Sequence, residues 1–129
     1  MTEINKIVIK FKDSKIMKGT TNDFSPNKKH FHIHLQSNEV VPIDVERLKA
    51  IFFVKDFHGN EAFKEAYKDV MAGGGKKIKV KFSDGEVIIG FSLGYSPGRH
   101  GFFLVPADLK SNNQRIFVIT SATERIEVQ

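Results

Sequence analysis

Short stretches in which apolar and polar residues alternate follow one another along most of this chain. Typical examples are KIVIKF (residues 6–11), HFHIHL (30–35), KIKVKF (77–82) and RIFVIT (115–120). Alternation with a period of two is typical of strands that bury one face and expose the other. Turn residues such as Asp84-Gly85 separate these stretches. The pattern predicts a mostly β protein made of short strands.

The chain also repeats itself at an offset of 71 residues. Residues 6–35 align with residues 77–106 without a gap. Each copy is predicted to contain five strands. Gly19 and Gly90 fall inside the second strand, where a missing side chain permits a sharp bend. Bending is what a short sheet needs to close on itself. Nine positions are identical: Lys6, Ile7, Lys10, Phe11, Asp13, Gly19, Ser25, Pro26 and Phe31 recur as Lys77, Ile78, Lys81, Phe82, Asp84, Gly90, Ser96, Pro97 and Phe102.

The segment between the copies, GNEAFKEAYKDVMAGGG, has a different pattern. Asn60 is a good N-cap, and the apolar residues that follow it recur at helical spacing. We expect one short helix at 60–72, ended by glycines. The predicted organisation is a first small barrel at 1–57, a helix and Gly-rich linker at 58–75, and a second small barrel at 76–129.

The turn and the bent strand resemble the first motif of the Sm-like fold. Copy two carries an Asp-Gly turn, a glycine five residues later and an aromatic residue five further on, as Asp84, Gly85, Gly90 and Tyr95. Copy one is similar, with Ser14 in place of the turn glycine. The resemblance, which extends to tandem small-barrel domains of unknown function in bacterial proteins, implies two tandem five-stranded Sm-like barrels joined by one helix.

The residues with which Sm proteins bind RNA do not carry over. An acidic residue is expected after the aromatic position, and an asparagine before the next strand. Ser96 with His100 or Gly101 stands there in copy two, and Ser25 with Lys29 or His30 in copy one. Asp23-Phe24-Ser25 also resembles half of the cyclic-dinucleotide loop of PilZ domains, but Lys28 replaces its glycine. The resemblance therefore indicates a fold without fixing a function.

Composition narrows the choice of function classes. The 129 residues include no cysteine, which excludes disulfides and thiolate chemistry. No apolar window is long enough for a membrane span, and no secretory signal follows the start, so we expect a cytoplasmic protein without a membrane partner. The net charge is +5. The positive charge favours an anionic partner, such as a nucleic acid, a nucleotide or an acidic protein surface. Alternatively, it reflects ordinary lysines exposed to solvent.

Two matching loops, SPNKKH and SPGRHG, carry the most suggestive polar chemistry. Each begins with a rigid Ser-Pro turn and then presents cations near an aromatic residue, Phe24 or Tyr95. Cations beside an aromatic platform can hold a phosphate while a base stacks. A third polar segment, KSNNQR, is typical of a hairpin turn. Alternatively, its side chains form the hydrogen-bonding rim of a binding site. The candidate ligand-binding residues are Lys28, Lys29, His30, Arg99, His100, Asn112, Asn113 and Arg115.

The alternating histidines of HFHIHL suggest a metal site, but strand geometry argues against one. His30 and His34 would be about 13 Å apart on a straight strand, which is too far for one ion. Copy two has Phe103 and Val105 where copy one has His32 and His34. We therefore interpret His32 and His34 as a candidate partner face and predict neither a metal nor a cofactor.

No nucleophile motif, phosphate loop or helical metal motif is present, so we expect no catalysis. Two function classes remain. The first is a non-enzymatic interaction or scaffold module that binds a protein partner, or a second copy, through a barrel edge or the groove between barrels. The alternative is a module that binds RNA, single-stranded DNA or a nucleotide through the two basic loops.

Overall fold

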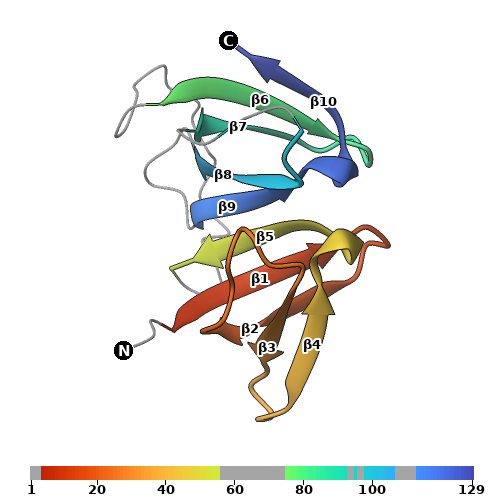
Figure 1. Ribbon diagram of the computed structural model, residues 1–129, viewed down its shortest axis with the longest axis vertical. Coiled ribbons are helices and arrows are strands. Elements are labelled where there is room, and N and C mark those ends of the chain that lie inside the picture. The colour runs from red at the N-terminus through yellow and green to blue at the C-terminus, as the bar shows by residue number, and fades with distance from the viewer. Residues whose placement is uncertain (1–3, 56–74, 93–94, 96–97, 107–112) are drawn as a thin grey trace, which may run out of the picture.

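The computed structural model describes residues 4–55, 75–92, 95, 98–106 and 113–129. Ten strands form one antiparallel sheet in the order β10-β6-β7-β8-β9-β5-β1-β2-β3-β4 (Figure 1). The elements are β1 (Asn5–Phe11), β2 (Ile16–Thr21), β3 (His30–His34), β4 (Val40–Asp44), the 3-10 turn η1 (Val45–Arg47), β5 (Leu48–Val54), β6 (Lys76–Phe82), β7 (Val87–Ser92), β8 (Gly101–Pro106), β9 (Asn113–Ile119), the 3-10 turn η2 (Thr120–Ala122) and β10 (Thr123–Val128). The prediction of a mostly β protein is confirmed.

The two halves of the sheet have the same internal order. The first half reads β5-β1-β2-β3-β4 and the second reads β10-β6-β7-β8-β9. The register agrees as well. Ile9 pairs with Ile51 on β5, and Val80, 71 residues after Ile9, pairs with Ile126 on β10. A register shift interrupts both pairings at the same end. Each strand of one half therefore has a structural counterpart in the other.

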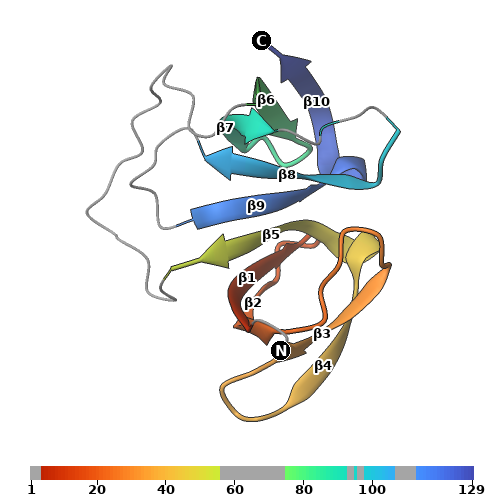
Figure 2. The ribbon, with the colours of Figure 1, turned by 60° about the vertical axis from the view of Figure 1, so that its left-hand side comes forward.

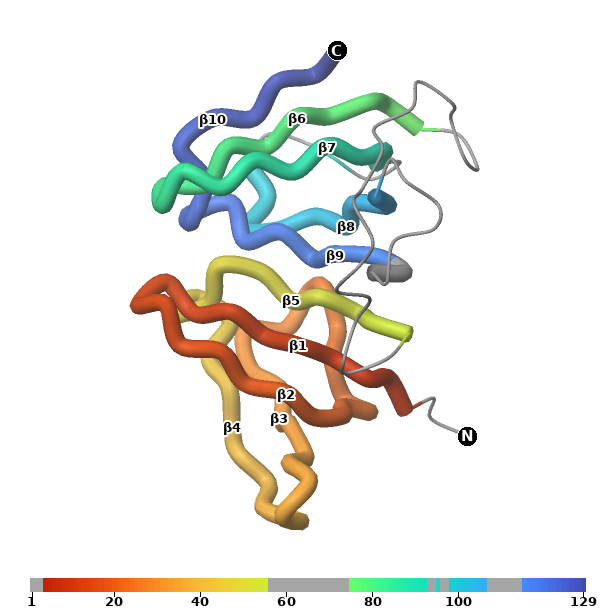
Figure 3. Tube along the Cα trace, turned by 180° about the vertical axis from the view of Figure 1, so that it is seen from behind, coloured from red at the N-terminus to blue at the C-terminus, as the bar shows by residue number. Residues whose placement is uncertain are grey.

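The halves meet where β5 pairs with β9. Ala50, Ile51 and Phe52 lie opposite Val118, Phe117 and Ile116. Figures 2 and 3 show the two strands side by side from different directions. All seven residues of β5 are buried, and the strand is paired along both of its edges. The junction therefore makes the sheet continuous and leaves β4 and β10 at its two ends.

The prediction of two closed Sm-like barrels is wrong. The structure has one open ten-stranded sheet. The reason lies in β5, which hydrogen-bonds to β1 of its own half and to β9 of the other half, and does not meet β4. A periodic pattern identifies strands but does not say which strand lies at each edge.

The expected joining helix lies outside the described residues. The predicted helix at 60–72 and most of the linker at 58–75 fall within residues 56–74, so the structure does not describe them. Among the residues that it does describe, the helical elements are the two 3-10 turns η1 and η2.

One apolar core runs through both halves. It includes Ile7, Phe31 and Ile33 from the first half and Ile78 and Leu104 from the second. The pattern of HFHIH in β3 is resolved as expected, with Phe31 and Ile33 buried and the three histidines exposed.

The glycines in the second strand of each half are needed for close packing. A Cβ added at Gly19 would collide with the backbone carbonyl oxygen of His34, and one added at Gly90 would collide with that of Val105. The adjoining strand therefore passes too close for any side chain at these positions.

Candidate functional site

Lys49 of β5 enters a polar socket on the second half of the sheet. Its Nζ lies 2.7 Å from Oδ2 of Asp84, and it also contacts Oε1 of Glu86. The same ammonium group lies over the ring of Phe82, 4.8 Å from the centroid. We call Phe82, Asp84 and Glu86 the Lys49 socket. A strand of one half thus carries a cation into an acidic turn of the other half.

The socket keeps Lys49 charged. Burial by itself would lower the pKa of Lys49, but the hydrogen bonds to Asp84 and Glu86 outweigh it and raise the pKa above its ordinary value. The hydrogen bond from Lys49 and that from the backbone N–H of Glu86 hold the pKa of Asp84 below its ordinary value. The Lys49 side chain is only 10% exposed, so the ion pairs are what make its burial tolerable.

The counterpart of this socket in the first half is an open groove along β4. Its volume is about 350 Å³. We define the β4 groove by its lining residues, Phe11, Asp13, Lys15, Ile16, Met17, Val41, Pro42, Ile43 and Arg47. Phe11 and Asp13 are the repeat counterparts of Phe82 and Asp84. Strand β5 covers the site in the second half, whereas β4 lies at the end of the sheet.

The charge of the two sites differs in sign. Lys15 stands in the first half where Glu86 stands in the second, and Arg47 ends η1 where Ala122 ends η2. Lys15 is 76% exposed, and its Nζ lies 3.9 Å from Oδ2 of Asp13. The rim of the β4 groove therefore carries two cations and one anion, while the Lys49 socket carries two anions.

The outer edge of β4 has backbone groups that can hydrogen-bond to a partner strand, except for the missing N–H of Pro42. The backbone N–H of His32 donates to Asp23 and its carbonyl accepts from Thr21, so both groups point away from β4. Pro42 lies directly opposite His32, and its backbone therefore points away from β3, toward the open edge. Because proline has no N–H, a strand added there would gain an acceptor but lose a donor.

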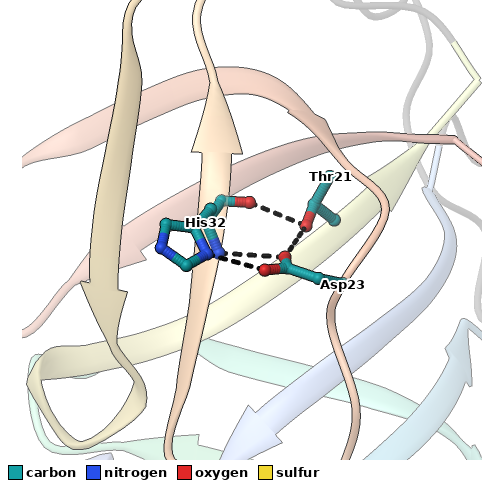
Figure 4. A network of polar contacts seen from close by, with 3 residues as sticks. All are labelled: Thr21, Asp23 and His32. Carbon is teal, nitrogen blue, oxygen red and sulfur yellow. Dashed lines mark hydrogen bonds and ion pairs between the residues drawn. The ribbon is translucent and has the colours of Figure 1, made fainter.

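His32 belongs to a compact polar network (Figure 4). Its Nδ1 lies 2.7 Å from Oδ2 of Asp23, and its backbone N–H donates to Oδ1 of the same carboxylate. Thr21 donates from Oγ1 to the carbonyl of His32, 2.8 Å away. Since an ionised carboxylate only accepts, the Nδ1 of His32 carries the hydrogen. The network fixes the start of the loop from β2 to β3.

This network also controls the ionisation of Asp23. Burial acts to raise the pKa of Asp23, but the hydrogen bonds from the His32 backbone and ring, with the Thr21 hydroxyl that Asp23 shares with the His32 carbonyl, hold it below its ordinary value. In the second half, Ser92 donates to the carbonyl of Phe103 in the same way that Thr21 donates to that of His32. His32 is therefore tied to its own loop, although its side chain is 53% exposed.

The loop that Asp23 anchors places Phe24 in an aromatic cluster between the halves. The Phe24 ring packs edge-on at 5.1 Å from Phe117 and 6.1 Å from Phe103. It also contacts Phe53 at 5.7 Å. The guanidinium of Arg115 stacks on Phe53 and Phe103, at 4.4 and 4.6 Å from the centroids. Phe24 thus packs against other rings and is not a free stacking platform.

The remaining predicted site residues lie in several places. Lys28, Lys29, His30 and His34 are exposed, as are Arg99 and His100. Of the predicted residues, the structure brings Arg115 and His100 to the same aromatic cluster, because the His100 ring lies 6.1 Å from that of Phe117. Asn113 begins β9, and Asn112 lies outside the described residues.

Sequence reasoning missed Lys49, Pro42 and Arg47. A signal for them was present in the repeat, because each differs in chemistry from its counterpart: Glu124, Phe117 and Ala122. Positions that agree between the two copies reflect the shared fold, whereas these three residues are informative because they differ between the copies.

Two structural findings concern metals and membranes. Within the described ranges, no group of three or more His, Cys, Asp or Glu side chains is placed to hold a metal ion. Among the same residues, no helix has the length and apolar character to cross a membrane.

Comparison with known proteins places the chain in a family. No curated protein and no solved structure matches it. A family model matches residues 3–129, which is nearly the whole chain and includes both halves of the sheet. The chain therefore belongs to the family of unknown function DUF6982.

Proposed function

We propose that this protein is a non-enzymatic interaction module that binds an extended segment of a protein partner along β4. The observation that carries the proposal is the open β4 groove, whose counterpart in the second half is covered by a strand of the same chain. The pairing of β5 with β9 is thus an internal example of the contact that we propose for β4. Strand addition at a sheet edge is a common mode of peptide recognition.

The chemistry of the groove defines the partner segment. The half-buried Val41 and the buried Ile43 line the groove, as their counterparts Ile116 and Val118 lie opposite β5 in the second half. Lys15 and Arg47 lie on the rim, so an acidic side chain suits the position that Lys49 takes in the second half. The expected ligand is an extended segment with alternating apolar residues and one carboxylate.

Pro42 limits how such a segment binds. One of the two hydrogen bonds of a paired position is lost there, because the Pro42 nitrogen carries no hydrogen. An edge of this kind resists indiscriminate strand pairing. Affinity must then come from side chains in the groove as well as from the backbone.

Selection from a random peptide library displayed on phage tests the proposal. We expect wild-type protein to enrich peptides that carry an acidic residue flanked by apolar ones, and Arg47→Glu to bind them at least tenfold more weakly. Arg99→Glu, a matched reversal of an exposed arginine in the loop before β8, should bind them normally. No enrichment, or enrichment that Arg47→Glu leaves unchanged, would contradict the proposal.

Nucleic-acid binding is the alternative, supported by the exposed side chains of Lys28, Lys29 and His30 in one loop and Arg99 and His100 in the other. The packing of Phe24 weighs against it, because the ring is engaged with other phenylalanines. Fluorescence anisotropy with labelled RNA and single-stranded DNA at two salt concentrations distinguishes nucleic-acid binding from peptide binding. Binding that falls steeply with salt and disappears in Lys28→Glu/Lys29→Glu would favour the alternative.

A further inference from the structure

The outer edge of β10 is the second open end of the sheet. On its inner side, β10 pairs with β6, and the backbone N–H of Gln129 donates to the carbonyl of Lys77 at 2.9 Å. Backbone groups alternate in direction along a strand, so Glu127 also faces β6 while Ile126 and Val128 face outward. Among the described residues, no strand pairs with that outer side. No proline interrupts β10.

The side chains of β10 form a self-complementary charge pattern. Arg125 and Glu127 are two residues apart and therefore lie on the same face of the strand. Within one chain, Nη1 of Arg125 lies 3.2 Å from Oε1 of Glu127. In an antiparallel pair of two β10 strands centred on Ile126, each Arg125 lies opposite the Glu127 of the other strand. Cross-strand pairs of opposite charge stabilise a sheet.

The backbone agrees with this register. A pairing centred on Ile126 places the two Ile126 residues opposite each other, and the N–H and C=O of Ile126 are the groups that point outward. Each Ile126 can then donate one hydrogen bond to the other and accept one in return. The Arg125 and Glu127 side chains fall at the adjacent non-hydrogen-bonded positions, where side chains approach most closely.

The other open edge suits β10 poorly. If β10 packed on β4 as β5 packs on β9, Arg125 and Glu127 would replace Ala50 and Phe52 and would face the apolar residues Ile43 and Val41. The outward position opposite Ile126 would be Pro42, which has no hydrogen to donate. Head-to-tail addition would bring Glu124 to the rim with Lys15 and Arg47, but it would set Arg125 and Glu127 against apolar residues and lose a hydrogen bond.

We propose that two copies of this chain associate through β10, antiparallel about Ile126, to form a two-fold symmetric dimer with one continuous sheet. The interface is isologous, so it closes after two chains and does not propagate. The proposal goes beyond the proposed function, because it uses the opposite end of the sheet and leaves a β4 groove free on each chain. The dimer would present two equivalent grooves to one partner or to two.

Charge reversal with the full chain tests the dimer by sedimentation velocity over a range of concentrations. Glu127→Arg places Arg125 opposite an arginine, and Arg125→Glu places Glu127 opposite a glutamate. Each variant alone should dimerise at least tenfold more weakly than wild type. An equimolar mixture should recover the dimer, because every cross-strand pair in the heterodimer again joins opposite charges. The double variant Arg125→Glu/Glu127→Arg should dimerise like wild type.

The controls make a negative result informative. Circular dichroism of each variant shows whether the fold is kept, and the recovery in the mixture requires folded chains. Arg47→Glu, at the other end of the sheet, should leave the dimer unchanged. A monomeric wild type at about 1 mM, association that survives both single reversals, or association lost in Arg47→Glu would each overturn the proposal. The first two outcomes leave peptide binding at the β4 groove unaffected, whereas the third would assign the β4 edge to self-association.

Discussion

His32 shows how a single residue changes meaning between sequence and structure. In the sequence it is one of three alternating histidines, which suggests a metal ligand or a partner face. In the structure its backbone and ring both bond to Asp23, which precedes Phe24. The pair orients the loop that carries Phe24 toward the junction. No spacing rule connects a histidine on a strand to an aspartate nine residues earlier, so only the fold revealed the pair.

The lowered pKa of Asp23 predicts an acid-dependent contribution to stability. A carboxylate with a folded pKa below its unfolded value stabilises the fold above the unfolded pKa, about 3.9, and this contribution is lost as the pH falls through the folded pKa. We expect Asp23→Asn to lower the free energy of unfolding by about 1 kcal/mol at pH 7, since charge-assisted hydrogen bonds are replaced by neutral ones.

Urea unfolding between pH 7 and about pH 3 measures this effect. The difference between wild type and Asp23→Asn should shrink as the pH falls below the ordinary range of an aspartate. Glu39→Gln, which removes an exposed carboxylate elsewhere in the first half, should show little difference at any pH. A constant gap between wild type and Asp23→Asn at every pH would show that ionisation of Asp23 is not involved.

At the scale of elements, the two β-hairpins that begin the halves differ at the turn position whose backbone has a positive φ. Ser14 has a φ of 75°, and its counterpart Gly85 has a φ of 96°. Both turns are closed in the same way, by hydrogen bonds from Phe11 to Lys15 and from Phe82 to Glu86. The second half thus has the residue that this backbone favours, whereas the first half holds a serine in a left-handed conformation.

We expect Ser14→Gly to raise the free energy of unfolding by about 0.5 kcal/mol and Gly85→Ser to lower it by about 1 kcal/mol. The positive φ costs a side-chain-bearing residue about 1–2 kcal/mol, and the entropy of glycine in the unfolded chain offsets part of that. No atom lies within 4 Å of a Cβ built at Gly85, so the cost there comes from the backbone alone. Thermal unfolding of the two variants measures both; effects of the same sign would refute the explanation.

The edge strands show where the halves have diverged. β5 is fully buried, whereas its counterpart β10 is exposed at Glu124, Arg125 and Val128. β9 is paired with β5, whereas its counterpart β4 carries an exposed proline. Matching strands thus differ where one lies at the junction and the other at an end, because the outer edge of an end strand meets solvent or a partner.

At the scale of the whole molecule, the junction joins two similar halves into one core. Beyond the pairing of β5 with β9, Nζ of Lys12 donates to Oγ of Ser121 at 2.7 Å, and Lys49 binds the turn between β6 and β7. The aromatic cluster around Phe24 adds side-chain contacts from both halves. We expect the two halves to unfold together, because neither keeps its core covered without the other.

Removing the charge of Lys49 tests how strongly the halves are joined. We expect Lys49→Met to lower the free energy of unfolding by about 1–2 kcal/mol, since it deletes two ion pairs but leaves Asp84 and Glu86 accessible to water. Lys81→Met, which breaks the exposed pair with Glu124, should cost less than about 0.5 kcal/mol. Equal effects in urea unfolding would mean that the Lys49 socket adds no more than a surface pair.

The sequence by itself determined the strands, because alternation, turn residues and the internal repeat are local features that can be read along the chain. It also determined which face of β3 is buried. These properties depend on neighbours a few residues apart, and each half supplies its own.

Only the tertiary structure decided how the strands are shared. That β5 joins β9, and that β4 and β10 remain at the ends, depends on contacts between segments more than fifty residues apart. The same contacts give Lys49 its acidic partners and leave the β4 groove open. Local patterns could not distinguish two closed barrels from one open sheet, because both bury the same faces of the same strands and differ only in which edges pair.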